Sequence, residues 1–284
     1  MSDEKSLKYN EPWILQRADP YVYRHTDGSY YFTASVPAYD GIVLRRAGTL
    51  AELSGAEEVM VWKKHESGPM SYHIWAPEIH YLFGKWYIYF AGGEAEDIWK
   101  IRPYVLECSG DDPLTDEWVE LGKMKRAAED EFSFEAFSLD ATVFENKGEY
   151  YYVWAEKVGV GKMISNLYIA KMESGNQLKT VQVLLTTPDY DWERKGFWVN
   201  EGPAVIHHDG KMFLTYSASE TGVDYCVGML SIDEDADILD PRLWKKERYP
   251  VLKTCEKLGI YGPGHNSFCL LYTSPSPRDR TRSR

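Results

Sequence analysis

The chain has 284 residues, of which 44% are hydrophobic and 27% charged, and its 44 acidic residues against 32 Lys and Arg give a net charge of −12. These values are typical of a folded globular protein. They argue against nucleic acid or an anionic membrane as a partner, because both bind faces rich in Lys and Arg. No apolar stretch approaches the ~20 residues that a membrane-spanning helix needs. The aromatic content of 14% indicates a large core, an aromatic-lined binding site or both.

The N-terminal residues and the cysteines bear on the cellular compartment. The first 13 residues contain no apolar segment of the kind found in a secretory signal, and the four cysteines are scattered without a CxxC pair. We therefore expect free thiols in a reducing compartment and a cytoplasmic protein.

One sequence pattern occurs four times along the chain. It consists of a small or acidic residue, two or three apolar residues, a polar turn ending in Gly, and an aromatic run. The glycines supply the positive φ of a tight hairpin turn, and the flanking Tyr, Phe, Val, Ile and Trp favour strands. Each copy therefore predicts a β-hairpin. The copies are Ala18–Ser35, Ala76–Gly93, Leu139–Glu156 and Asn200–Ser219, with turn glycines at Gly28, Gly84, Gly148 and Gly210.

Further strand-like runs lie between the hairpins, so that each repeat holds about four strands, the content of one propeller blade. A fifth copy begins at Gly262, but the turn glycine expected near position 272 is missing. The sequence therefore predicts an all-β, five-bladed β-propeller whose fifth blade is truncated. A β-sandwich with accidental spacing is the alternative. The additional runs are Gly41–Arg45, Val105–Cys108, Leu167–Lys171 and Cys226–Ser231.

The C-terminal segment differs from the rest of the chain in composition. Residues 269–284 contain four Arg against one Asp, a charge of 4 − 1 = +3. We therefore divide the chain into a propeller domain, residues 1–268, and a basic tail of foreign appearance, residues 269–284, that replaces the end of the fifth blade. A natural disordered basic tail is the other interpretation.

Acidic residues stand at the start of three repeats: Asp19, Asp140 and Glu201. In a propeller the first strand of each blade faces the central channel, and ligands bind at one mouth of it. Carboxylates that converge there raise one another's pKa, so that one acts as an acid while another stays ionised as a base. Glycoside hydrolysis needs this division of roles. For any one of these acids alone, a turn cap or a pairing with Arg is the simpler interpretation.

Five short segments in order resemble the signature segments of glycoside hydrolase family 43, and the resemblance covers roughly Trp13–Phe268. It implies a five-bladed propeller and an inverting enzyme, since members are chiefly α-L-arabinofuranosidases, arabinanases and β-xylosidases. The segments are Arg17–Pro20, Trp75–Glu78, Ser138–Ala141, Asn200–Pro203 and Gly262–His265.

The resemblance also implies a role for each acid. Asp19 matches the general base that activates water, Glu201 the general acid, and Asp140 the third carboxylate, which tunes the pKa of the acid. An inverting enzyme would hold the carboxylates of Asp19 and Glu201 ~6.5–9.5 Å apart. His265 matches a channel histidine near a water-coordinated ion, often calcium. No cofactor is required, and a structural calcium in the channel is a secondary expectation beside a hydrogen-bonded histidine.

Four further residues are candidates for substrate binding. Trp75 offers an aromatic face on which a sugar ring can stack, and His73 lies beside it. Glu220 and Tyr225 follow the fourth hairpin, where they could reach a sugar hydroxyl. A core or rim position is the competing interpretation for Trp75.

The stretch Ile98–Glu107 resembles arabinofuranosidases that act on arabinan and arabinoxylan side chains. The expected function is therefore an inverting glycosidase that releases terminal α-L-arabinofuranosyl residues from arabinose-containing oligosaccharides. A β-xylosidase would share the three acids, a retaining fructan-type hydrolase would hold its two carboxyl groups ~5–5.5 Å apart, and a sugar-binding propeller would catalyse nothing. Linkage preference and oligomeric state are left open by the sequence.

Overall fold

The computed structural model describes residues 12–160 and 162–269. Within these ranges the fold is all-β, and the helices are short 3-10 turns, at Ala51–Ser54, Asp191–Glu193, Pro241–Leu243 and Glu256–Leu258. None of the helices that the structure describes is long and apolar enough to cross a membrane. The four cysteines are free thiols, as the sequence predicts.

The strands form three sheets. The first contains β1 (Ala18–Arg24), β2 (Tyr30–Ser35), β3 (Gly41–Ala47) and β4 (Val59–Lys63) in chain order. The second contains β5 (Tyr72–Leu82), β6 (Lys85–Gly93), β7 (Arg102–Cys108) and β8 (Val119–Lys123) in chain order.

The third sheet joins the last two of the four complete repeats. Its strands are β9 (Ser138–Asn146), β10 (Glu149–Val160), β11 (Lys162–Ser174), β14 (Trp198–His208), β15 (Lys211–Ala218), β16 (Cys226–Asp233) and β17 (Lys245–Lys246), and the short strands β12 (Gln177–Leu178) and β13 (Val183–Thr186) also pair with β11. The two repeats meet where β11 pairs with β14 in parallel, Ile164 opposite Trp198 and Ser165 opposite Val199.

The predicted hairpins are confirmed: β1–β2, β5–β6, β9–β10 and β14–β15 are antiparallel pairs. No atom lies within 4 Å of the position that a Cβ would take on any of their turn glycines, so these turns require glycine for its conformation and not for space. The φ angles are 91° at Gly28, 76° at Gly84, 78° at Gly148 and 72° at Gly210.

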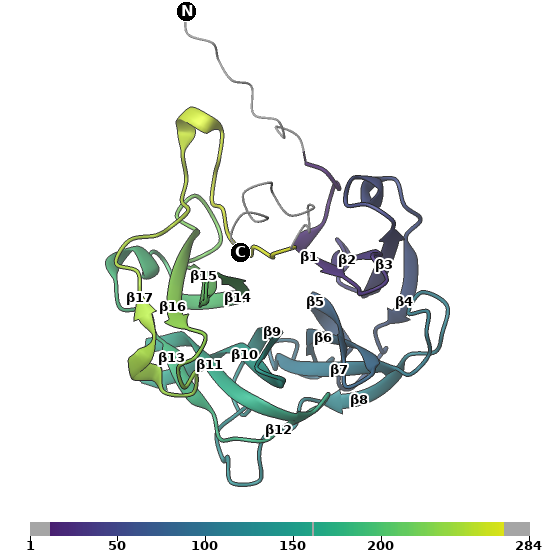
Figure 1. Ribbon diagram of the computed structural model, residues 1–284, viewed down its shortest axis with the longest axis horizontal. Coiled ribbons are helices and arrows are strands. Elements are labelled where there is room, and N and C mark those ends of the chain that lie inside the picture. Colours follow the sequence, from purple (N-terminus) through teal and green to yellow (C-terminus); the bar gives the residue numbers. More distant parts are fainter. Residues whose placement is uncertain (1–11, 161, 270–284) are drawn as a thin grey trace, which may run out of the picture.

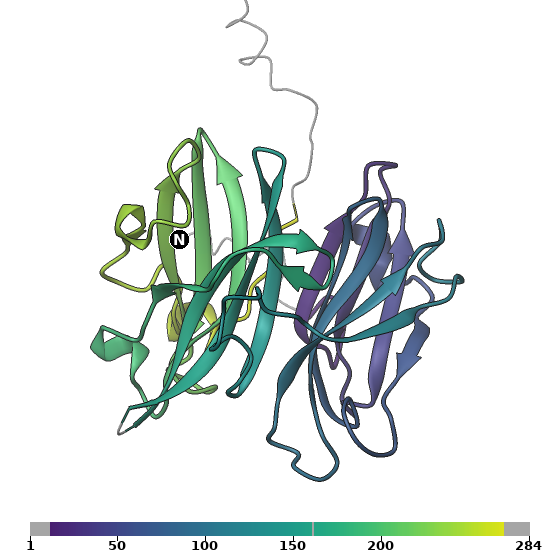
Figure 2. The same ribbon diagram turned by 90° about the horizontal axis from the view of Figure 1, so that it is seen from below.

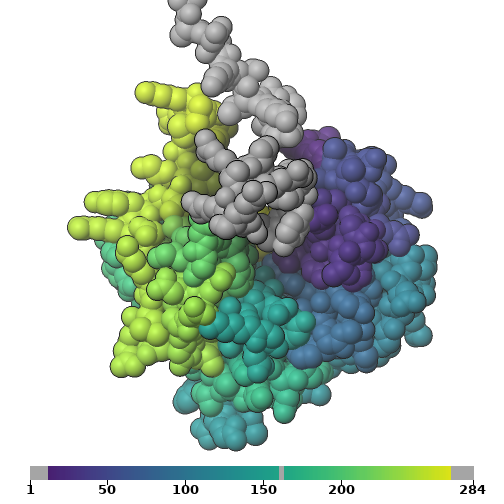
Figure 3. Space-filling model, viewed as in Figure 1, coloured from purple at the N-terminus to yellow at the C-terminus, as the bar shows by residue number. Residues whose placement is uncertain are grey.

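The sheets surround a common middle, and β1, β5, β9 and β14, the first strands of the four repeats, lie nearest to it (Figure 1). Seen from the side, the two N-terminal sheets stand next to the third sheet (Figure 2). On the surface the repeats follow one another around the molecule in sequence order (Figure 3). This arrangement differs from the two stacked layers of a sandwich, the alternative interpretation of the sequence.

The core lies between neighbouring repeats. One cluster, with Trp86 and Ile88, joins the first two sheets, and a second, with Tyr89 and Trp154, joins the second sheet to β9–β11. A third cluster, with Leu214, fills the space between the last two repeats. Much of the aromatic content of the chain therefore serves these packed layers.

The described residues contain no strand after β17, so the fifth blade expected from Gly262 onward is not seen, and the sheets do not close into a ring. The final described segment instead connects β15 to β1. Asn266 Nδ2 donates to Thr215 Oγ1 (3.0 Å), and Ser267 Oγ donates to the carbonyl of Pro20 (2.7 Å). Apart from Cys269, the predicted basic tail lies outside the described residues.

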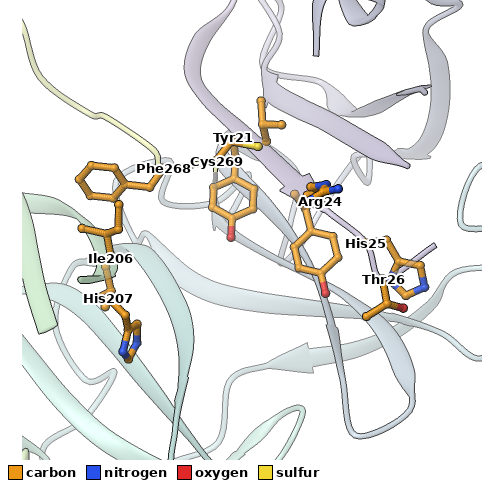
Figure 4. Close-up of a pocket in the computed structure, with 11 residues that line it drawn as sticks. Tyr21, Arg24, His25, Thr26, Ile206, His207, Phe268 and Cys269 are labelled. Carbon is orange, nitrogen blue, oxygen red and sulfur yellow. The ribbon is translucent and has the colours of Figure 1, made fainter. Parts of the chain in front are cut away.

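A pocket of about 490 Å³ lies between β1 and β14, where the repeats do not meet. Figure 4 shows Ile206, His207 and Phe268 on one side of it and Tyr21, Arg24 and His25 on the other. Acidic side chains are absent from its described lining.

Candidate active site

The first strand of each complete repeat is irregular near its start, and each irregularity contains a residue with positive φ. Such a bulge bends the strand and re-aims a side chain, and bulges are frequent next to active sites. Register shifts occur between Ala18 and Tyr21, Trp75 and Glu78, Glu201 and Ala204, and opposite β9 between Val153 and Ala155. The positive-φ residues are Asp19 (52°), Ala76 (47°), Asp140 (49°) and Gly202 (53°).

These residues with positive φ occupy equivalent positions in the repeats and can be used to align the repeats with one another. His265, with a φ of 45°, follows Gly264 in the fifth copy and so matches Asp19 and Asp140. Glu201 stands one residue before the matched position, at Gly202. Glu201 is therefore displaced by one residue from the repeat position of Asp19 and Asp140. Positive φ in residues other than Gly costs on the order of 1–3 kcal/mol each and persists where the surrounding structure enforces it.

The irregular strand starts meet at a second pocket, of about 570 Å³, on the central side of the sheets. It brings together the three acids that the sequence singled out. Of the eight predicted site residues, His73 is the one that does not line this pocket. The other seven are Asp19, Trp75, Asp140, Glu201, Glu220, Tyr225 and His265.

Asp19 is held by two side chains. Its Oδ2 accepts a hydrogen bond from Ser35 Oγ (2.6 Å), and its Oδ1 lies 3.1 Å from His265 Nδ1. Ser35 Oγ also accepts from the amide of Ala76 (2.8 Å), which ties the first sheet to the second at this point. The carboxylate is therefore fixed in place while about a quarter of its side chain, 24%, stays exposed to the pocket.

Asp140 is the most enclosed of the three acids, with 8% of the residue exposed. Burial and the negative charge of Asp19 raise the pKa of Asp140 well above its usual range, against a hydrogen bond that the amide of Gly202 donates to its Oδ2 (3.2 Å). A Cβ on Gly202 would lie 3.3 Å from His265 Nδ1, so glycine permits the close approach of that ring.

Glu201 has a pKa that is clearly raised by its surroundings. Burial and the charge of Asp140 raise the pKa of Glu201 to about 7, against the hydroxyl of Tyr225, which donates to its Oε1 (2.8 Å). A carboxyl group with this pKa is protonated in a large fraction of molecules near neutral pH. It can therefore give up a proton under conditions in which an ordinary glutamate cannot.

Aromatic rings form one wall of the pocket. Trp75 and Trp99 line it, and the ring of His73 lies between them, with centroids 4.4 Å from Trp75 and 4.9 Å from Trp99. Burial lowers the pKa of His73, and its Nε2 has no hydrogen-bond partner among the described residues. His73 therefore packs against both rings of the wall without lining the pocket itself, and its contact with substrate stays a prediction.

Tyr225 and Glu220 reach the pocket from the loop after β15. Tyr225 is buried and orients Glu201 through its hydroxyl, so its position fits a supporting role for the acid. Glu220 is exposed at the edge, where its amide donates to the carbonyl of Lys195 (3.0 Å).

Several lining residues were not among the sequence candidates. Trp99 is 60% exposed and lies in the stretch Ile98–Glu107, which carried part of the family resemblance. Lys157 lies in β10, one residue after the predicted hairpin Leu139–Glu156, and belongs to no sequence motif. The remaining aromatic and sulfur-containing members are Tyr39, Phe137, Met163, Phe197 and Trp198.

The predicted calcium site at His265 has no ready-made ligand set in the described part of the chain. Calcium takes six to eight oxygen ligands. No group of three or more His, Cys, Asp or Glu side chains within residues 12–160 and 162–269 is arranged to hold a metal ion. His265 instead faces two carboxylates, with Nδ1 3.1 Å from Asp19 and 3.7 Å from Asp140. Metal binding at this histidine stays a prediction.

Known proteins resemble this chain over nearly its whole length. The sequence model described as Glycosyl hydrolases family 43 matches residues 9–272. A Streptomyces avermitilis protein named extracellular exo-α-(1→5)-L-arabinofuranosidase is 49% identical over 263 residues, 93% of this chain and 53% of the relative. A Streptomyces chartreusis protein of the same name is 47% identical over 260 residues, 92% of this chain and 77% of the relative. The chain thus spans about half the length of the first of these relatives.

Solved structures agree with the sequence relatives. The crystal structure of an α-L-arabinofuranosidase from Lactobacillus brevis superposes with a TM-score of 0.84 at 50% sequence identity. The match covers 92% of this chain and 82% of that one.

The names of the two Streptomyces relatives correct one prediction. Both proteins are named extracellular, so the expectation of a cytoplasmic protein is wrong. It depended on the absence of an apolar segment in the first 13 residues and on the cysteine pattern, and neither observation determines the compartment.

Proposed function

Because the chain belongs to glycosyl hydrolase family 43, we propose that it is an inverting glycosidase that releases terminal α-L-arabinofuranosyl residues from arabinan or arabinoxylan oligosaccharides. The names of the relatives from Streptomyces avermitilis, Streptomyces chartreusis and Lactobacillus brevis support this substrate class. The exo-α-(1→5) specificity in the names of the Streptomyces relatives makes the 1,5-linkage the first one to test.

The observation that carries the proposal is the shared pocket of Asp19, Asp140 and Glu201, in which the pKa of Glu201 is raised to about 7. Hydrolysis of a glycosidic bond needs one carboxyl group that is protonated and one that is ionised, on opposite sides of the reacting carbon. Glu201 meets the first requirement. Asp19, which accepts a hydrogen bond from Ser35 and lies beside His265, is suited to the second.

In the proposed reaction the terminal sugar enters the pocket beside the aromatic wall of Trp75 and Trp99. Glu201 donates its proton to the glycosidic oxygen as the bond from that oxygen to the anomeric carbon breaks. Asp19 takes a proton from a water molecule, whose oxygen attacks the anomeric carbon from the opposite face. The proton passes from Asp19 to solvent, and Glu201 takes one up. The α-linked substrate gives a β-configured sugar as its first product.

Asp140 acts through Glu201 in this scheme. Its amide contact with Gly202 holds it next to the strand start that bears Glu201, and its charge helps to keep Glu201 protonated. Tyr225 holds Glu201 from the other direction. The distance between the carboxylates of Asp19 and Glu201 is expected to be ~6.5–9.5 Å, which leaves space for the attacking water.

The same proposal extends to the fold: residues 1–268 form a catalytic domain of five blades, the last of them truncated by the sequence of residues 269–284. The positive φ of His265, at the repeat position of Asp19 and Asp140, supports a fifth first strand. The pocket between β1 and β14 is the place where the remainder of such a blade would stand.

The test is hydrolysis by the 284-residue chain of α-1,5-arabinotriose, p-nitrophenyl α-L-arabinofuranoside and p-nitrophenyl β-D-xyloside. We expect release of L-arabinose, and proton NMR of the early product should show the β anomer. Faster turnover of the xyloside would indicate a β-xylosidase. An α anomer would contradict inversion. Arabinotriose binding without hydrolysis of any substrate would indicate a sugar-binding protein.

A further inference from the structure

Lys157 is the one Lys or Arg among the described residues that line the pocket of the three acids. Lys157 has no role in the reaction proposed above. The side chain projects from β10, where Lys157 pairs with Ser165 of β11 and Gly159 pairs with Met163. Because side chains two residues apart share a face of a strand, Lys157, Ser165 and Met163 lie on the same face of this sheet, and all three line the pocket.

The ammonium group of Lys157 is held over an aromatic ring. Its Nζ lies 3.8 Å from the centroid of Phe137, a cation–π contact, and the amide of Lys157 donates to the carbonyl of Phe137 (2.9 Å). The segment before Phe137 is itself anchored, because buried Glu156 accepts hydrogen bonds from the amides of Phe134 and Ala136, both at 3.0 Å. The position of the ammonium is therefore set before any ligand arrives.

The hydrogen-bonding capacity of this ammonium is largely unused. A lysine ammonium has three N–H donors. In the part of the chain that the structure describes, Nζ of Lys157 lies over the ring of Phe137, and no oxygen atom accepts a hydrogen bond from it. Burial lowers the pKa of Lys157, opposed by the charge of Glu201, which is the acid of the pocket that acts on it. Ser165, which pairs with Lys157, donates from its Oγ to the carbonyl of Asn200 (3.2 Å), the residue before Glu201, so Lys157 lies on the Glu201 side of the pocket.

The side of the pocket determines which part of the substrate Lys157 can reach. In the proposed reaction Glu201 faces the oxygen that leaves, and Asp19 faces the water on the opposite side of the sugar. The pocket lining also contains Met163, which shares the sheet face of Lys157, and Phe197, and their side chains are 55% and 66% exposed. A group beside Glu201 therefore meets the part of the substrate that leaves.

We propose that Lys157 binds the sugar on the leaving side of the scissile bond, by donating hydrogen bonds from its ammonium to ring hydroxyls of that sugar. The inference rests on the proposed function. It makes Lys157 a specificity residue that favours oligosaccharides over glycosides whose leaving group carries no hydroxyl.

The experiment compares two substrates across three variants. Values of kcat and KM are measured with α-1,5-arabinotriose and with p-nitrophenyl α-L-arabinofuranoside for the wild type, Lys157→Met and Lys157→Arg. The matched control is Lys179→Met, which removes an exposed lysine of the same repeat. Thermal unfolding of each variant reports on the fold.

The expected result for Lys157→Met is a 10- to 100-fold loss of kcat/KM with arabinotriose, the usual effect of losing a hydrogen bond from a charged donor, and a change under threefold with the aryl glycoside. Lys157→Arg should recover part of the loss, and Lys179→Met should match the wild type. Equal losses on both substrates, or no loss on either, would overturn the inference.

A different outcome would contradict the proposed function, namely that the wild type hydrolyses neither substrate. In that case calorimetric titration with arabinotriose still decides the role of Lys157. Binding at least fivefold weaker in Lys157→Met, with Lys157→Arg intermediate, supports it, and equal binding overturns it. If Lys157→Met does not fold, Lys157→Arg gives the decision: a change confined to arabinotriose supports the inference, and any other result overturns it.

Discussion

Glu201 and Glu78 both lie in the first strand of a repeat, β14 and β5, yet their surroundings are opposite in character. Glu201 shares its pocket with Asp140, whose charge helps to raise the pKa of Glu201 to about 7. Glu78 is buried, and its Oε2 lies 2.9 Å from Nε2 of His80, whose Nδ1 is 3.4 Å from the hydroxyl of Tyr21. Glu201, which lies beside another acid in the pocket, is suited to proton transfer, whereas Glu78, which is paired with His80 outside the pocket lining, is suited to a structural role.

The two pockets described above also differ in whether acidic side chains are among the described residues that line them. The pocket between β1 and β14 has about 490 Å³ and the pocket of the acids about 570 Å³, so size does not separate them. The difference is that irregular strand starts with positive φ aim carboxyl groups into the second one. Local backbone geometry, and not volume, therefore marks the candidate active site.

The largest effect is expected from the substitution Glu201→Gln, which preserves the shape of the side chain and removes its ability to donate a proton. We expect kcat/KM with α-1,5-arabinotriose to fall by ~10²–10⁴, the range associated with loss of a general acid. The loss should be smaller with a p-nitrophenyl leaving group, which needs less protonation. Steady-state kinetics provide the measurement, and retention of more than a tenth of the wild-type value would contradict the assignment.

The second prediction concerns the other acid. His80→Ala removes the hydrogen-bond partner of buried Glu78 and should lower the free energy of unfolding by about 1–3 kcal/mol. Because His80 lies outside the lining of the pocket, kcat/KM should stay within threefold of the wild type at a temperature where the variant is folded. Chemical denaturation and kinetics together check this. Unchanged stability combined with a large kinetic loss would reverse the roles assigned to the two regions.

The smallest expected effect is a shift in pH dependence. Glu201 must be protonated to act, so kcat/KM should decline above an apparent pKa of about 7. The charge of Asp140 contributes to raising that pKa, so Asp140→Asn should move the alkaline limb to lower pH, apart from any loss in rate. A pH–rate profile of both proteins measures the shift. Movement of the limb to higher pH would show that Asp140 acts on Glu201 in another way.

The raised pKa of Glu201 has a matching effect on stability. Its folded pKa lies above the value of an unfolded glutamate, so the folded state binds the proton more tightly. The stabilisation is complete below the unfolded pKa and is lost as the pH rises through about 7. Denaturation at pH 5 and pH 8 should therefore show a larger drop for the wild type than for Glu201→Gln, and an equal drop would contradict the raised pKa.

Local sequence chemistry was sufficient to predict the hairpins. Gly28 and Gly148 supply positive φ at their turns, and the aromatic flanks favour strands. The acids Asp19, Asp140 and Glu201 could be found as well, because each lies beside a recurring strand start. The histidine partner of Glu78 was also within reach, since Glu78 and His80 are two residues apart and so lie on one face of a strand.

Other features depend on contacts between segments that are distant in the chain. The parallel pairing of β11 with β14, which joins two repeats in one sheet, has no signal in either strand. Trp99 reaches the pocket from a loop, and Lys157 does so from within β10, at a position that the repeat pattern does not mark. Their positions depend on how the sheets pack against one another, which the hydrophobic spacing of a single strand does not specify.

The hairpins and their order can be predicted from the amino-acid sequence, because turn glycines and strand-forming side chains act over a few residues. The acidic residues of the first strands can be found as well, because they recur near the start of the repeats. The packing of the sheets places Asp19 where its charge raises the pKa of Asp140, and Asp140 where its charge raises the pKa of Glu201. A pKa depends on burial and on charges a few ångströms away, and the acids that act on Asp140 and Glu201 come from other strands.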